Sequence, residues 1–216
     1  MIQTPTFAIR PSFLGVERTS ADAAICVAGI PFDLGTSNRP GARFAPAAIR
    51  QASRMLVAGD HPASWAWGHG SPFYHAIEEG LVDPRHMIQI GIRSPLHRDI
   101  FDWTVGKGVT IVSAEDVHES GPQAVAERIR AVLGAGPSYL SFDIDALDPA
   151  FAPGTGTPEV GGLATWQARA ILRRLAGLRF AGMDVVEVSP PYDVAEITAL
   201  AAATIAWDYI GLLAPR

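Results

Sequence analysis

Apolar positions along the 216-residue chain follow two different spacings. Short continuous apolar runs, bounded by glycine, proline or polar residues, are typical of strands that are buried on both faces. Longer segments carry apolar residues on one stripe at helical spacing. The two kinds alternate, so the sequence predicts a single α/β domain over residues 1–216, a three-layer sandwich with a mainly parallel sheet. Strands are expected at 24–30, 87–92, 109–112, 137–142 and 180–188, and helices at 47–55, 73–80, 99–105, 122–133, 163–175 and 197–213. A further helix start is expected at 113–116, where two carboxylates lie in the first turn.

Two aspartates follow the strand expected at 137–142. Strand side chains alternate between faces, so Asp143 and Asp145 are expected on the same side at its C-terminal end. Two carboxylates held together cannot both stay ionised at low free energy, so one takes a proton or a cation lies between them. Ligands collect at the C-terminal ends of strands in open α/β sheets, which favours a metal ion. The alternative is that both aspartates only cap the strand and the following turn.

Composition and charge narrow the class of protein. Hydrophobic residues make up 48% of the chain and charged residues 18%, which excludes a disordered chain. The net charge is -5 and the basic residues are scattered, so neither nucleic acid nor a membrane surface is an expected partner. Cys26 is the only cysteine, which excludes an internal disulfide and favours a cytoplasmic setting. Residues 1–22 lack a signal-peptide pattern and are expected to form an irregular N-terminal arm.

Two longer strings connect these features to a known family. Residues 141–158 read SFDIDALDPAFAPGTGTP, and residues 29–50 read GIPFDLGTSNRPGARFAPAAIR. Both resemble motifs of the ureohydrolases, the arginase and agmatinase family, with wording closest to the agmatinases. The one small departure in the second string is Ala45, where the family usually has glycine before the proline. Because the matches span many separated positions, the resemblance is specific, and it implies the arginase-like fold.

This resemblance implies a reaction and a set of site residues. The family hydrolyses a guanidino group with two manganese ions and releases urea and an amine, and its members are homo-oligomers. At the matching positions Asp143 and Asp145 are expected to ligate manganese, His69 to shuttle a proton, and Glu187 to hold the substrate guanidinium in the active site. From the residues alone, His69 is equally a loop histidine between two glycines, and Glu187 has the alternative of a salt bridge to an arginine.

The chain departs from the family between about residues 61 and 68. There the family carries a Gly-Gly-Asp-His motif and an Asp-Ala-His-x-Asp motif, which supply four further manganese ligands, and neither is present. Residues 58–61 read AGDH, but they run into Pro62, so His61 is expected to be a turn residue. The resemblance therefore implies an internal deletion and an incomplete fold.

Two hypotheses for the function follow. The first is an agmatinase-like ureohydrolase that uses manganese to hydrolyse agmatine or a similar guanidino-amine. The alternative is a catalytically inactive, internally deleted member of the family that keeps only part of the metal site.

Overall fold

The computed structural model describes residues 31, 46, 47 and 72–213. Contacts divide the chain into two units, Met1–Ala66 and Trp67–Arg216. Apart from two helical residues at 46 and 47, the described strands and helices all lie in residues 72–213 of the second unit. The single-domain prediction therefore stays a prediction. Several expected features lie outside the described residues: the strand at 24–30, the helix at 47–55 apart from Ala47, the N-terminal arm 1–22, the break between 61 and 68, and Cys26, His61 and His69.

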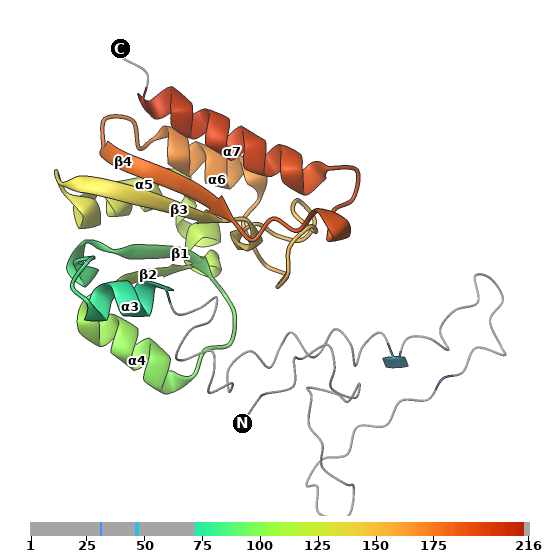
Figure 1. The fold of residues 1–216 in the computed structure, drawn as a ribbon, viewed down its shortest axis with the longest axis horizontal. Coiled ribbons are helices and arrows are strands. Elements are labelled where there is room, and N and C mark those ends of the chain that lie inside the picture. Colours follow the sequence, from blue (N-terminus) through green and yellow to red (C-terminus); the bar gives the residue numbers. More distant parts are fainter. Residues whose placement is uncertain (1–30, 32–45, 48–71, 214–216) are drawn as a thin grey trace, which may run out of the picture. The chain divides into compact units, whose positions relative to one another are not determined.

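Two parallel ladders form the sheet layer (Figure 1). β1 (Ile88–Ile92) pairs with β2 (Thr110–Ser113), and β3 (Pro137–Asp143) pairs with β4 (Arg179–Val186). These strands coincide with the expected ones to within two residues at each end, and their parallel pairing is confirmed. One difference is that no ladder joins the two pairs among the described residues, so the expected single sheet is divided into two.

Residues 72–213 contain five α-helices. They are α3 (Pro72–Glu78), α4 (Arg98–Lys107), α5 (Ala114–Leu133), α6 (Thr165–Arg173) and α7 (Ile197–Leu213), with 3-10 turns η6 (Pro84–His86), η7 (Ile144–Ala146) and η8 (Pro190–Tyr192).

Helix α5 takes in both the helix start expected at 113–116 and the helix expected at 122–133. The Ser113 hydroxyl accepts a hydrogen bond from the N–H of Asp116 at 3.0 Å, and the Asp116 carboxylate accepts one from the N–H of Ser113 at 2.9 Å. This reciprocal capping satisfies two N–H groups at the helix start. Gly121 then has a φ of 75°, directly before Pro122, so α5 consists of two helical segments joined at a kink.

Helices α5, α6 and α7 together link the two ladders through packing. Helix α5 contacts β1, β2 and α6, while α7 contacts both β4 and α6 (Figure 1). The core therefore lies between the ladders and these three helices. Its most deeply buried side chains come from β2, α5, the segment after β3 and α7: Val112, Val117, Val125, Ile144, Leu147 and Ile205.

A buried ion pair joins α6 to α7. The side chain of Asp208 on α7 is only 5% exposed and accepts hydrogen bonds from Arg169 at 2.7 Å and Arg173 at 2.8 Å. Burial acts to raise the pKa of Asp208, but the hydrogen bonds from the two guanidinium groups outweigh it, so this pKa lies below its usual range. Pairing thus keeps a buried carboxylate ionised.

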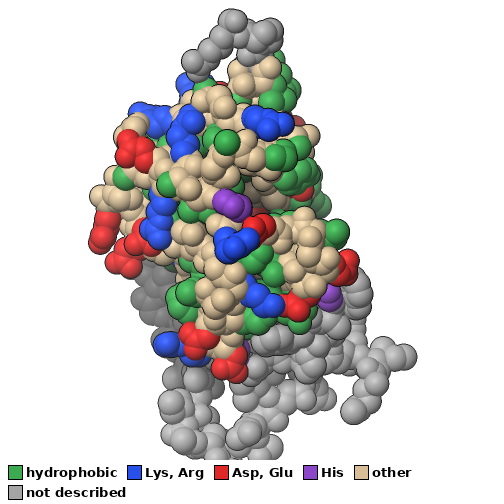
Figure 2. Space-filling view, turned by 90° about the vertical axis from the view of Figure 1, so that its left-hand side faces the viewer, with side chains coloured by type: hydrophobic (Ala, Val, Ile, Leu, Met, Phe, Trp, Pro, Cys, Tyr) green, Lys and Arg blue, Asp and Glu red, His purple; other side chains and the backbone are tan. Residues whose placement is uncertain are grey.

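Surface charges of both signs are interspersed on the face shown in Figure 2, and neither sign gathers into a continuous patch. None of the helices in the described part of the chain has the length and apolar character needed to span a lipid bilayer. His86, His97 and His118 are exposed.

Candidate active site

Asp143 and Asp145 meet at the C-terminal end of β3. Asp143 is the last residue of the strand, and Asp145 lies in the 3-10 turn η7 that follows. The Asp143 carboxylate accepts a hydrogen bond from the N–H of Asp145 at 3.1 Å, while Ile144 between them is fully buried. The strand ends at Asp143, so the alternation of strand side chains cannot place Asp145 on the same side. The turn η7 brings the two carboxyl groups together instead. Asp143 also caps this turn, so the capping interpretation and the site interpretation do not exclude each other.

Glu187 lies beside this pair. Asp143 is paired with Val186, the last residue of β4, and Glu187 follows directly with a φ of 64°. Few residues other than glycine adopt this left-handed backbone conformation, and such residues are often found at functional sites. The structure therefore brings three of the expected site residues, Asp143, Asp145 and Glu187, to neighbouring strand ends, while His69 lies outside the described residues.

The loop after η7 returns to Glu187. Thr155 forms an isolated antiparallel bridge with Val188, and the carbonyl of Gly154 accepts a hydrogen bond from the N–H of Ser189 at 2.7 Å. A Cβ atom built on Gly156 would lie 3.9 Å from Oε2 of Glu187. The glycine-threonine loop of the 141–158 string therefore forms part of the wall around the Glu187 carboxylate.

The electrostatics of Asp143 differ from those of an ordinary surface carboxylate. Burial, the charge of Asp145 and, to a smaller extent, the charge of Glu187 raise the pKa of Asp143 to about 7. The same proximity that destabilises a second negative charge would favour a bound cation or a shared proton. The charge conflict expected from the sequence is therefore present in the folded chain.

Asp148, the third aspartate of the string, has a different part. Its carboxylate accepts hydrogen bonds from the N–H groups of Ala150 at 2.9 Å, Gly161 at 2.8 Å and Gly162 at 3.2 Å. These bonds, the one from Ala150 first, lower the pKa of Asp148. A Cβ on Gly162 would lie 2.5 Å from the backbone nitrogen of Asp148, so only glycine fits there. Asp148 organises the loop.

Two polar residues near the site carried no functional prediction from the sequence. Thr157 donates its hydroxyl to Oδ2 of Asp145 at 2.8 Å. Arg93, at the end of β1, donates to the backbone carbonyls of Asp145 and Glu159 at 2.6 Å each. Two features of the sequence could have pointed to these residues. Thr157 lies inside the 141–158 string, and Arg93 follows directly after an apolar strand.

Manganese, the metal that the resemblance implies, fits this site in chemistry. Carboxylate oxygens are ligands that Mn²⁺ prefers. A bound cation would also offset the charge repulsion from Asp145 and Glu187 that helps to raise the pKa of Asp143. In number the donors fall short, because residues 72–213 and the few described residues before them contain no group of three or more metal-holding side chains. Asp143 and Asp145 are thus part of a metal site at most, as far as the described chain reaches.

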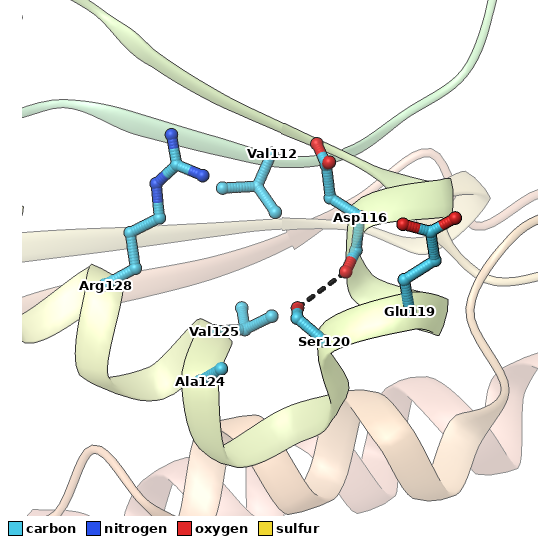
Figure 3. A pocket seen from close by; sticks show the side chains of 7 residues that line it. All are labelled: Val112, Asp116, Glu119, Ser120, Ala124, Val125 and Arg128. Atoms are coloured by element: carbon cyan, nitrogen blue, oxygen red, sulfur yellow. Dashed lines mark hydrogen bonds between the residues drawn. The ribbon is translucent and has the colours of Figure 1, made fainter.

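A separate hollow lies at the kink of α5 (Figure 3). It has a volume of about 240 Å³, and the carboxylate of Asp116 on its wall is already used to cap the helix. Ser120 donates to the carbonyl of Asp116 at 2.6 Å. This hollow is therefore structural, and it is distinct from the carboxylate site. Its wall consists of Val112, Asp116, Glu119, Ser120, Ala124, Val125 and Arg128.

Parallel strands with helical crossovers and acidic side chains at the strand ends define an α/β protein whose ligand site lies at the carboxyl edge of its sheet. Comparison with known proteins identifies the family. The arginase family model matches residues 23–68 and 58–211. The chain belongs to the arginase family of hydrolases, as the strings in its sequence indicated.

Individual relatives agree with this assignment. The chain is 36% identical to an agmatinase from Photorhabdus laumondii over 287 aligned positions, which cover 94% of the chain and 91% of the relative. It is 34% identical to a guanidinopropionase from Pseudomonas aeruginosa over 299 positions, which cover 98% and 94%. Both alignments are longer than the chain of 216 residues, so each relative carries residues that this chain lacks.

A solved structure confirms the arginase-like fold. A hypothetical agmatinase from Burkholderia thailandensis superposes with a TM-score of 0.64 at 42% identity. The matched part covers 79% of this chain and 55% of that structure, so the chain spans little more than half of the solved relative.

Proposed function

We propose that this chain is an agmatinase-like ureohydrolase, which hydrolyses a small guanidino-amine such as agmatine to urea and an amine. Its family membership and the agmatinases among its relatives support this reaction class. The observation that carries the proposal is the convergence of Asp143, Asp145 and Glu187 at the ends of two paired strands, inside a loop that the family signature supplies.

Each acid has a part suited to its place. Asp143 and Asp145 would hold manganese, which when bound lowers the pKa of a water molecule and stabilises negative charge in the reaction. The Glu187 carboxylate would bind the planar guanidinium through two parallel hydrogen bonds. Thr157 keeps the Asp145 carboxylate oriented. His69, which lies outside the described residues, remains the proposed proton shuttle.

The alternative is a catalytically inactive family member with an internal deletion between about residues 61 and 68. Three observations favour it. The described residues contain no complete metal-holding group, and the relatives carry residues that this chain lacks. The two matches to the family model also meet at residues 58–68, where the deletion is expected.

One experiment separates the two. Purified, metal-dialysed protein is titrated with manganese, the ions bound per chain are counted, and urea release is measured with agmatine, guanidinobutyrate and guanidinopropionate. The active hypothesis predicts bound manganese and urea release, with both reduced at least tenfold in Asp143→Ala because a metal ligand is removed.

The matched control for this variant is Asp102→Ala, which removes an exposed carboxylate on α4. It should behave like the unaltered protein in both measurements. If the unaltered protein neither binds manganese beyond the level of Asp143→Ala nor releases urea, the inactive alternative holds.

The assembly and setting of the chain follow the same proposal. The resemblance implies a homo-oligomer, and the single cysteine favours the cytoplasm as its setting. Helix α7 supports self-association because its outer side exposes large apolar residues: Leu200 is 67% exposed, Trp207 72% and Ile210 58%.

A further inference from the structure

Arg93 makes an unusual set of contacts for a residue at the end of a strand. Its Nη2 donates to the carbonyls of Asp145 and Glu159 at 2.6 Å each and lies 3.4 Å from the carbonyl of Leu147. Its Nε donates to the carbonyl of Glu159 at 3.1 Å. One half-buried guanidinium therefore binds both ends of the loop that begins at η7.

The same loop is held close to β1 by packing. Gly91 has a φ of 87°, and a Cβ atom there would lie 3.1 Å from Cδ1 of Leu163 and 3.6 Å from Cβ of Ala146. No side chain separates the end of β1 from the loop at this point. The short approach allows the next arginine along the strand to reach three carbonyls of the loop.

These contacts act on the Asp145 carboxylate. The hydroxyl of Thr157 holds Oδ2 of Asp145 at 2.8 Å, and Thr157 lies two residues before Glu159. Arg93 thus holds the backbone at Asp145 and, two residues after Thr157, at Glu159. Both partners of the hydrogen bond between Thr157 and Asp145 are therefore anchored. If Arg93 released these carbonyls, the two residues could separate and the carboxylate could rotate.

We propose that Arg93 is a positioning residue, which fastens residues 145–159 to the end of β1 and thereby orients the Asp145 carboxylate for its ligand. The effect on metal binding rests on the proposed function, whereas the anchoring of the loop rests on the contacts of Arg93 described above. An ammonium group on lysine cannot replace the planar fork, because it has no Nε to pair with Nη2 at Glu159.

The chain contains a matched control. Arg130 on α5 also donates to backbone carbonyls, from Nε and Nη2 to Arg174 at 3.1 and 2.6 Å and from Nη2 to Ala176 at 2.7 Å. It is half-buried like Arg93 and touches none of the three acids. Arg93→Lys and Arg130→Lys therefore lose similar bonds, in one case at the site and in the other away from it.

The test compares both lysine variants of the full chain with the unaltered protein. In metal-free protein, amide hydrogen exchange of peptides covering 145–162 should speed up about tenfold in Arg93→Lys and stay unchanged in Arg130→Lys. In the manganese titration, followed by the electron paramagnetic resonance of the bound ion, Arg93→Lys should weaken binding about tenfold and alter the spectrum, and kcat should fall more than KM rises. Arg130→Lys should change neither affinity nor spectrum.

Several results would overturn the inference. Equal effects of the two variants on exchange would mean that Arg93 does not fasten the loop. Faster exchange with unchanged manganese affinity, in a protein that binds the metal, would mean that the loop does not orient Asp145. If the unaltered protein binds no manganese and releases no urea, the proposed function fails, and the exchange data alone decide whether Arg93 fastens the loop.

Discussion

At the scale of single residues, Asp143 has opposite requirements for folding and for binding. A cation-binding site needs its carboxylate ionised, whereas burial and the neighbouring acids favour the protonated form and raise its pKa to about 7. In the unfolded chain an aspartate loses its proton near pH 4. Between these values the native state holds more protons than the unfolded state, so the free energy of unfolding from this group falls as the pH rises.

We therefore predict that Asp143→Asn stabilises the metal-free protein at high pH. Asparagine removes the charge that repels Asp145 and Glu187, so the melting temperature at pH 8 should rise by about 3 °C, with little change near pH 4. Calorimetry in the presence of a chelator measures this. A lower melting temperature for Asp143→Asn at pH 8 would contradict the proposed electrostatic conflict.

The opposite sign is expected for the neighbouring Asp148→Asn, which serves as the control. Three backbone N–H groups stabilise the ionised Asp148 carboxylate, and an amide has only one acceptor oxygen to replace it. This variant should lose about 1–2 kcal/mol of stability at pH 8.

Much of this site could be predicted from the sequence, and its limits have physical causes. The D-x-D pattern at the end of an apolar run indicated that Asp143 and Asp145 would share a site, although the 3-10 turn η7 and not strand alternation brings them together. The part played by Arg93 was not predictable, because its partners are carbonyls 52 to 66 residues away and backbone carbonyls leave no mark in a sequence.

At the scale of the elements, the buried contact between α6 and α7 should be worth more than any exposed ion pair. We predict that Asp208→Asn lowers the free energy of unfolding by about 2 kcal/mol at pH 7, because Arg169 and Arg173 then face a neutral group. The folded pKa of Asp208 lies below its unfolded value, so this contribution should vanish as the pH falls through the folded pKa.

Asp102→Asn is the matched control for Asp208. Asp102 pairs with Arg98 one helical turn away, with both side chains largely exposed, so its loss should change stability by about 0.3 kcal/mol. Denaturant titrations of the two variants give both values. Equal losses would show that burial adds nothing to the Asp208 pair.

The sequence also predicted the elements themselves well, and the exception is instructive. The final helix is expected and found at 197–213, since its long apolar pattern has one interpretation. Helix α5 joins the start expected at 113–116 to the helix expected at 122–133, across Gly121 and Pro122, two residues that normally mark helix ends. The capping by Ser113 and Asp116 and the burial of Val117 compensate for this kink.

At the scale of the whole molecule, the exposed apolar side of α7 leads to a prediction about assembly. We expect light scattering to show a homo-oligomer, and Trp207→Lys to shift it towards the monomer, because a charge replaces a large apolar contact. Val160→Lys, at an apolar residue that is 80% exposed in a loop, should leave the mass unchanged. A monomer at all concentrations of the unaltered protein would rule out self-association.

The separation of the strands into two ladders bears on how the chain unfolds. No strand hydrogen bonds connect β1 and β2 with β3 and β4 in the described chain, so the packing of α5, α6 and α7 and the contacts of Arg93 link the two ladders. Such a link is weaker than a continuous sheet. On heating, the β1–β2 part and the β3–β4 part should therefore unfold as separate cooperative units. The calorimetric enthalpy of unfolding would then exceed the van't Hoff enthalpy.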